Sequence, residues 1–231
     1  MIVVGKIIAI HAACGDLKFL CQFEKTLSAW VGNDLRWHCL NSVVSHEAAK
    51  QELEQTRSGV AIILLHGRSD GFRAGDYDAS QDDDSPAMFM NKGQLEPLRG
   101  KAVFCLSCKG NEHAAEAIQK GARVFVGFDD VPFYRFDPVT GNEVPLRSLT
   151  KHCQGLILST VTATFERLIH RGASFDDAID YLRLWVRRAA VEFVRNQKSE
   201  QHRNDIAYLF LKMEETVRVH GDGKLRFGDL I

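Results

Sequence analysis

The stretch Lys101-Ala-Val-Phe-Cys-Leu-Ser-Cys-Lys-Gly110 decides the fold expected for this chain. Ala102 to Leu106 is an unbroken apolar run, too short for a helix and bounded on both sides by glycine. Such a run predicts a strand buried on both faces, as in a parallel sheet. Cys108 follows where this strand should give way to a loop, whereas Cys105 is expected inside the strand. Because ligands of open α/β sheets bind beyond the carboxyl ends of the strands, Cys108 is the cysteine placed for chemistry.

A second apolar run, Val60 to Leu65, ends in the same way at His66-Gly67. If the two strands are parallel neighbours, His66 and Cys108 leave the sheet at one edge. A histidine beside a cysteine can take the thiol proton and leave a thiolate, which is the nucleophilic species. The pair therefore predicts a His-Cys dyad, with the backbone amides of Gly67 and Cys108 as donors to an oxyanion.

Apolar residues at strand or helix spacing continue along the rest of the chain and predict an α/β protein. The expected strands are 6–10, 35–44, 60–65, 102–106 and 122–128, and the expected helices are 17–31, 46–56, 112–120, 156–170, about 175–195 and 204–219, the last with an optional strand. Ser45, Asn111 and Ser174 are expected to cap three of these helices. This order predicts a doubly wound, mostly parallel sheet with helices on both faces and a helical C-terminal part from about residue 150.

Length and composition limit the classes of protein to consider. With 231 residues and no linker that divides them, the chain is expected to form one domain, 1–231. A hydrophobic share of 45% with 26% charged residues is typical of a soluble globular protein. The net charge of −1 predicts no general attraction to nucleic acid or to anionic membranes. No signal peptide opens the sequence and no apolar run approaches roughly 20 residues, so a cytoplasmic protein is expected.

Six cysteines in a chain of this kind are expected to be reduced thiols. Cys105 and Cys108 form a Cys-x-x-Cys motif, for which a redox pair and half of a zinc site are the alternatives. A zinc site normally needs a second closely spaced pair, which the sequence lacks. A redox pair needs both sulfurs at a helix N-terminus, whereas Cys105 is expected within a strand. No metal and no other cofactor is therefore predicted.

The segment 67–94 has the composition of a long loop and is rich in aspartate. The aspartates are Asp70, Asp76, Asp78, Asp82, Asp83 and Asp84. The segment is expected to be either a solvated surface loop or an acidic rim that attracts a basic substrate to the region after His66. The spacing of its aspartates also resembles the first half of a calcium loop. However, Gln81 and Ala87 stand where the glycine and the bidentate glutamate of such a loop belong.

An apolar strand that ends in His-Gly, followed by one that ends in Cys, resembles the caspase-like (clan CD) cysteine peptidases. This group includes caspases, metacaspases, gingipains, separases and bacterial CHAT domains, and the stretch 106–110 is most similar to CHAT and separase. The stretches 121–128, 165–174 and 220–222 also fit the group. The resemblance implies a caspase-like fold and an endopeptidase that cleaves a protein substrate. It leaves Cys105 and Cys108 open as the nucleophile, and the position at the strand end favours Cys108.

By the same resemblance, an acidic residue after the strand 122–128 helps to hold a basic side chain next to the cleaved bond. Asp130, with Asp129 beside it, is the candidate; an ordinary turn is the alternative for this pair. Asp70, four residues after His66, is a further candidate because of its charge and position. The resemblance also implies a regulated bacterial protease of stress or antiviral defence, switched on by a partner protein. The alternatives are an inactive interaction module of the same fold and a nucleotide-binding doubly wound domain, although the chain lacks Gly-x-Gly-x-x-Gly.

Overall fold

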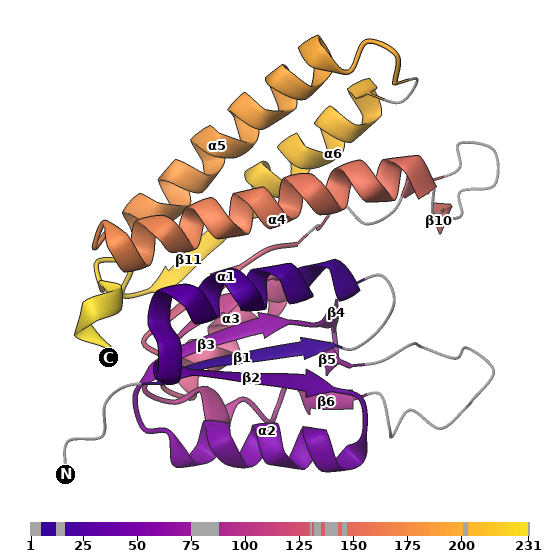
Figure 1. The fold of residues 1–231 in the computed structure, drawn as a ribbon. Coiled ribbons are helices and arrows are strands. Elements are labelled where there is room, and N and C mark those ends of the chain that lie inside the picture. The colour runs from indigo at the N-terminus through magenta and orange to yellow at the C-terminus, as the bar shows by residue number, and fades with distance from the viewer. Residues whose placement is uncertain are drawn as a thin grey trace.

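The computed structural model describes residues 6–12, 17–74, 88–129, 131, 135–136, 143–144, 147–200 and 203–230, with the backbone alone from 135 to 150. Within these residues, helices lie on both sides of a six-stranded sheet, and three long helices separate the last two strands of this sheet along the chain (Figure 1).

The strands of the main sheet lie in the order β11-β8-β7-β3-β1-β2. They are β1 (Lys6–Ala12), β2 (Leu35–Leu40), β3 (Gly59–Leu64), β7 (Lys101–Cys105), β8 (Val124–Gly127) and β11 (Arg218–Gly221). All neighbours are parallel except β11, which runs antiparallel to β8. Every residue of β3, β7 and β8 is buried, because helices cover both faces of these strands. The predicted α/β class with a mostly parallel sheet is therefore confirmed.

The helices are α1 (Cys21–Val31), α2 (Val43–Gln55), α3 (Gly110–Gln119), α4 (Arg147–His170), α5 (Phe175–Asn196) and α6 (Arg203–Thr216). Figure 1 shows α1 and α4 on one side of the sheet and α2 on the other. Phe165 of α4 links this side together, since its ring lies 5.2 Å from that of Phe23 in α1 and 5.0 Å from that of Phe104 in β7. Among the described helices, none combines the length and apolar character needed to cross a bilayer.

Shorter elements connect this framework. The 3-10 helices are Lys18–Leu20, Gly32–Asp34, Glu96–Leu98 and Phe227–Asp229, and a two-stranded hairpin consists of β9 (Arg135–Phe136) and β10 (Glu143–Val144). The prediction that 67–94 is a loop is wrong for its described part. β4 (His66–Arg68), β5 (Gly71–Arg73) and β6 (Met88–Asn91) form a small antiparallel sheet, whose residues Phe72, Phe89 and Met90 are buried. The aspartates from 76 to 84 lie outside the described residues, and so does the stretch that resembles the first half of a calcium loop.

The predicted starts of α2 and α4 need correction, and the predicted cap of α5 is confirmed. Ser42, not Ser45, caps α2, because the Ser42 hydroxyl accepts from the Ser45 amide at 3.3 Å and the Ser45 hydroxyl accepts from the Ser42 amide at 3.0 Å. The strand expected over 35–44 consequently ends at Leu40. α4 begins at Arg147, earlier than the predicted 156. Ser174 caps α5 as predicted, accepting from the Asp177 amide at 3.2 Å.

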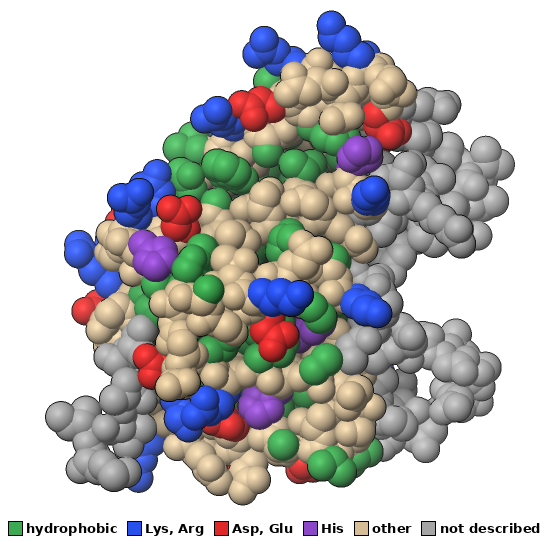
Figure 2. Space-filling model, viewed as in Figure 1, with side chains coloured by type: hydrophobic (Ala, Val, Ile, Leu, Met, Phe, Trp, Pro, Cys, Tyr) green, Lys and Arg blue, Asp and Glu red, His purple; other side chains and the backbone are tan. Residues whose placement is uncertain are grey.

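Charged side chains of both signs are interspersed over the face shown in Figure 2. Three arginines of α5 follow the same pattern, since Arg183, Arg187 and Arg188 each have an acidic partner. Arg183 pairs with Asp180 at 2.7 Å, and Arg187 pairs with Glu214 at 3.0 Å. These ion pairs neutralise the arginines on this face of α5, which the sequence alone shows only as a basic cluster.

Lys101, at the start of β7, is a buried cation whose charge depends on pH. Only 2% of the residue is exposed, and Nζ donates to the carbonyls of Pro97 at 2.8 Å and Arg99 at 3.2 Å. Burial lowers the pKa of Lys101 from 10.5 to about 8. Between these two values the unfolded chain holds a proton that the folded protein has lost, so folding becomes more favourable as the pH rises through this window.

We therefore expect the difference in unfolding free energy between the wild type and Lys101→Met to change with pH. Between pH 7 and pH 10 it should shift in favour of the wild type by about 1–2 kcal/mol. Urea denaturation of both proteins at several pH values measures this difference, and the exposed Lys25→Met serves as the control. Parallel pH profiles for the wild type and Lys101→Met would contradict the prediction.

Candidate active site

The two polar strand ends meet at the carboxyl edge of the sheet. β3 and β7 are parallel neighbours, with Ile63 opposite Cys105. The amide of Leu106 donates to the carbonyl of Ile63 at 2.9 Å, which extends the pairing beyond β7. His66 and Cys108 follow these two strands by a few residues. The predicted arrangement of parallel neighbours is therefore confirmed, and both residues leave the sheet at the same edge.

Gly67 is the point of closest approach between the two strand ends. A Cβ atom on Gly67 would lie 1.7 Å from the carbonyl oxygen of Cys108 and 2.4 Å from the hydroxyl of Ser107. Real Cβ atoms do not come this close to backbone, so only glycine fits at this position. The segment that carries His66 consequently lies directly against the backbone of Cys108.

The pairing of β4 with β5 indicates that the amide of Gly67 is not used within this hairpin. β4 and β5 are joined through Ser69 and Asp70, with Arg68 opposite Gly71 and Gly67 opposite Phe72. Residue pairs in an antiparallel ladder alternate between hydrogen-bonded and non-hydrogen-bonded, starting with a bonded pair next to a two-residue turn. This alternation directs the Gly67 amide away from β5 and outside the ladder of the hairpin.

The two cysteines of the motif have different surroundings. Cys105 is completely buried in β7, and burial raises its pKa well above the ordinary value, so it stays a neutral thiol. Cys108 is partly exposed, and its Sγ lies 3.9 Å from the carbonyl oxygen of Val131, to which the thiol donates. Among the described residues other than glycine, Lys109 is the one with a positive φ, 56°. It turns the chain sharply from Cys108 into α3.

The predicted specificity residues do not share one environment. Asp70 lies in the turn between β4 and β5, where its carboxylate accepts from Nη2 of Arg73 at 2.7 Å. Asp129 follows β8, and its carbonyl accepts from the amide of Lys109 at 2.9 Å, which holds the end of β8 beside Cys108. Asp130 lies outside the described residues.

Asn111 does not cap α3 as predicted; Lys109 occupies the cap position, and its side chain makes no capping hydrogen bond. Instead Nδ2 of Asn111 donates to the carbonyl of Thr216 at 2.7 Å, and Oδ1 lies 3.0 Å from Nε2 of His220. These contacts connect the first turn of α3 to the end of α6 and to β11. The partners are distant in sequence, which is why the sequence alone did not indicate them.

Sequence reasoning missed His113, which the structure places behind the candidate site. Its Nε2 lies 2.7 Å from the carbonyl oxygen of Arg68, the last residue of β4, and the residue is fully buried. A single histidine within a helix carries no periodic or spacing signal, so no feature of the sequence distinguishes it from an ordinary core residue.

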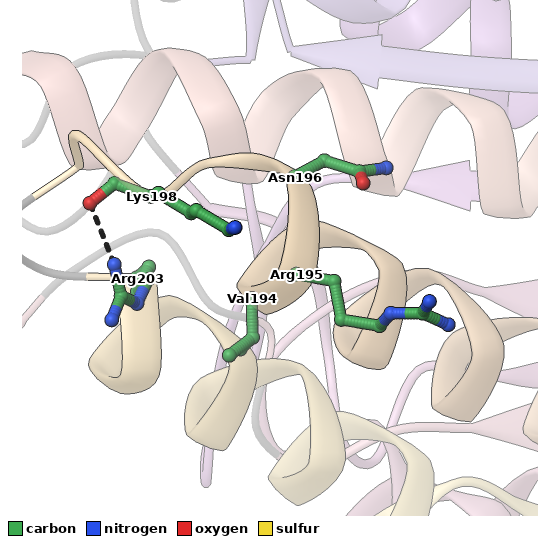
Figure 3. Close-up of a pocket in the computed structure, with 5 residues that line it drawn as sticks. All are labelled: Val194, Arg195, Asn196, Lys198 and Arg203. Atoms are coloured by element: carbon green, nitrogen blue, oxygen red, sulfur yellow. Dashed lines mark hydrogen bonds between the residues drawn. The ribbon is translucent and has the colours of Figure 1, made fainter.

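Metal-binding clusters and clefts are the other kinds of site that the described residues could form. Within the described ranges, no group of three or more His, Cys, Asp or Glu side chains is arranged to hold a metal ion. A cleft lies where α5 leads into α6, and its lining shares no residue with the candidate active site (Figure 3). It is lined by Val194, Arg195, Asn196, Lys198 and Arg203. In this cleft Nη1 of Arg203 donates to the carbonyl of Lys198 at 2.6 Å.

No model of a protein family matches this chain, and no curated protein matches it either. The class that fold and site define is an α/β protein whose histidine and cysteine strand ends meet at the carboxyl edge of a mostly parallel sheet.

Proposed function

We propose that this protein is a caspase-like cysteine endopeptidase, most similar in kind to CHAT and separase domains, with His66 and Cys108 as its catalytic dyad. The observation that carries the proposal is the contact between Gly67 and the backbone of Cys108. It supports a geometry in which an imidazole and a thiol from two neighbouring strands face one substrate. The partial exposure of both residues leaves room for that substrate.

In the proposed mechanism, His66 takes the thiol proton of Cys108, and the thiolate attacks the carbonyl carbon of the peptide bond. The N-terminal end of α3 begins two residues after Cys108, and its partial positive charge stabilises a thiolate there. The negative oxygen of the tetrahedral intermediate accepts hydrogen bonds from the amides of Gly67 and Cys108. His66 then protonates the leaving amine, and with His66 as base, water releases the acyl group from sulfur.

We further propose that the residue before the cleaved bond is Arg or Lys. Asp70 is neutralised by Arg73, so within the described residues the preference depends mainly on Asp129 at the end of β8. A guanidinium or ammonium group beside this carboxylate gains charge-assisted hydrogen bonds. A substrate with Asp at that position would meet like charge.

A peptide-library cleavage assay tests both parts of the proposal, with Cys108→Ala as the inactive control. We expect cleavage after basic residues, and we expect Asp129→Ala to lower kcat/KM for these substrates about 10- to 100-fold. Asp34→Ala should leave kcat/KM unchanged, because this exposed carboxylate directly precedes β2 and so lies at the amino edge of the sheet, opposite the candidate site. A preference for Asp or for large apolar residues would refute the proposed specificity.

The resemblance to CHAT domains implies an activating partner, so covalent labelling is the sharper test of the dyad. An electrophilic peptide should modify Cys108 in the wild type and react far more slowly with His66→Ala. Equal labelling of both proteins would count against the peptidase. Thermal stabilisation by a nucleotide, without labelling, would instead favour the nucleotide-binding alternative.

A further inference from the structure

The first turn of α3 holds the hairpin that carries His66. Lys109 Nζ donates to the hydroxyl of Ser69 at 2.9 Å, across the turn between β4 and β5. One turn further along α3, His113 reaches the carbonyl of Arg68 at 2.7 Å. The hydrogen bond from Lys109 to Ser69 is exposed to solvent, so it contributes little to holding the hairpin. His113 makes the buried contact.

The surroundings of His113 fix its protonation. A carbonyl oxygen only accepts hydrogen bonds, so Nε2 of His113 carries the proton and donates it to Arg68. Nδ1 is buried without a hydrogen-bond partner, as expected for the bare nitrogen of a neutral imidazole. Burial lowers the pKa of His113, and the hydrogen bond to Arg68 offsets part of this change. The ring also packs edge-on against Phe72 of β5, with centroids 4.7 Å apart.

These contacts fix β4 at two adjacent residues. Gly67 lies against the backbone of Cys108, and Arg68 is held from the other side by His113. His66 is the residue directly before Gly67. A three-residue strand held at two of its positions has little freedom at the third, so the backbone of His66 cannot shift far without breaking one of these contacts.

We propose that His113 is a positioning residue that locks β4, and with it His66, against Cys108. The proposal rests on the proposed function, because His66 and Cys108 are its dyad. His113 itself does not touch the substrate. Its role is to keep the imidazole of His66 and the backbone amide of Gly67 in the geometry that the reaction needs.

Two variants separate this role from simple packing. His113→Leu removes the donor and keeps a buried apolar side chain, whereas His113→Gln keeps an N–H near the position of Nε2. His46→Leu is the matched control, since His46 is another buried helical histidine whose ring packs edge-on against a phenylalanine, Phe89 of β6. Hydrogen–deuterium exchange of residues 66–73 should speed up at least about 10-fold in His113→Leu. His113→Gln should restore most of the protection, and exchange in α5 should remain unchanged in all three variants.

The alkylation rate of Cys108 by iodoacetamide, followed by mass spectrometry as a function of pH, tests the coupling to the dyad. If His66 assists the thiol, the pH profile of His66→Ala differs from that of the wild type, and His113→Leu should shift in the same direction. Where the His66→Ala profile differs from that of the wild type, a wild-type profile in His113→Leu would overturn the inference, and so would unchanged exchange of residues 66–73. If His66→Ala itself matches the wild type, the dyad fails, and the exchange measurement still decides whether His113 holds the hairpin.

Discussion

Replacing Gly67 with alanine is expected to destabilise the protein and to disable the candidate site together. The added methyl group would meet the carbonyl oxygen of Cys108 at 1.7 Å, so one of the two backbones has to move. We expect the free energy of unfolding to fall by about 2–4 kcal/mol. Displacement of a catalytic group by about 1 Å can lower a rate about 100-fold, and we expect at least this loss in labelling of Cys108.

Gly155→Ala is the matched control for this substitution. Gly155 lies within α4, and a Cβ atom there would meet nothing within 4 Å. Alanine should therefore stabilise the helix by about 0.5–1 kcal/mol. Urea denaturation and the labelling assay on both variants provide the comparison. Wild-type stability and labelling in Gly67→Ala would contradict the close contact on which the site depends.

Substitution of the two cysteines should separate chemistry from packing. We expect Cys108→Ala to lower the cleavage rate by about 10⁴-fold or more, because it removes the nucleophile, and to change stability little. Cys105→Ala should keep activity and cost about 1–2 kcal/mol of unfolding free energy, because it leaves a small cavity in β7.

Single-turnover cleavage and urea denaturation of the two cysteine variants measure both effects. The double variant serves as a control, since its activity should match that of Cys108→Ala alone. Activity that survives in Cys108→Ala and is lost in Cys105→Ala would show that the buried cysteine is the nucleophile. That result would also mean that β7 opens during the reaction.

The core strands could be predicted because unbroken apolar runs such as 102–106, bounded by glycine, carry a strong local signal. β4 and β5 could not, since three residues are too few to show alternation, and β4 contacts Cys108 and α3, which are distant in sequence. The sequence does not distinguish Ser42 from Ser45 as the cap of α2, because both residue types suit the position and the two bond to each other. The candidate dyad followed from strand ends alone, whereas His113 acts through a carbonyl 45 residues away.

The antiparallel strand β11 has a consequence for how this protein can vary in evolution. The chain leaves the sheet after Gly127 and returns to pair Arg218 with that same residue. The segment between these points, which includes α4 to α6, forms an insertion whose two ends are paired with each other in the sheet. Such an insertion can gain or lose helical turns without shifting the register between β3 and β7, the strands that precede His66 and Cys108. Relatives with helical parts of different length could therefore keep the same site.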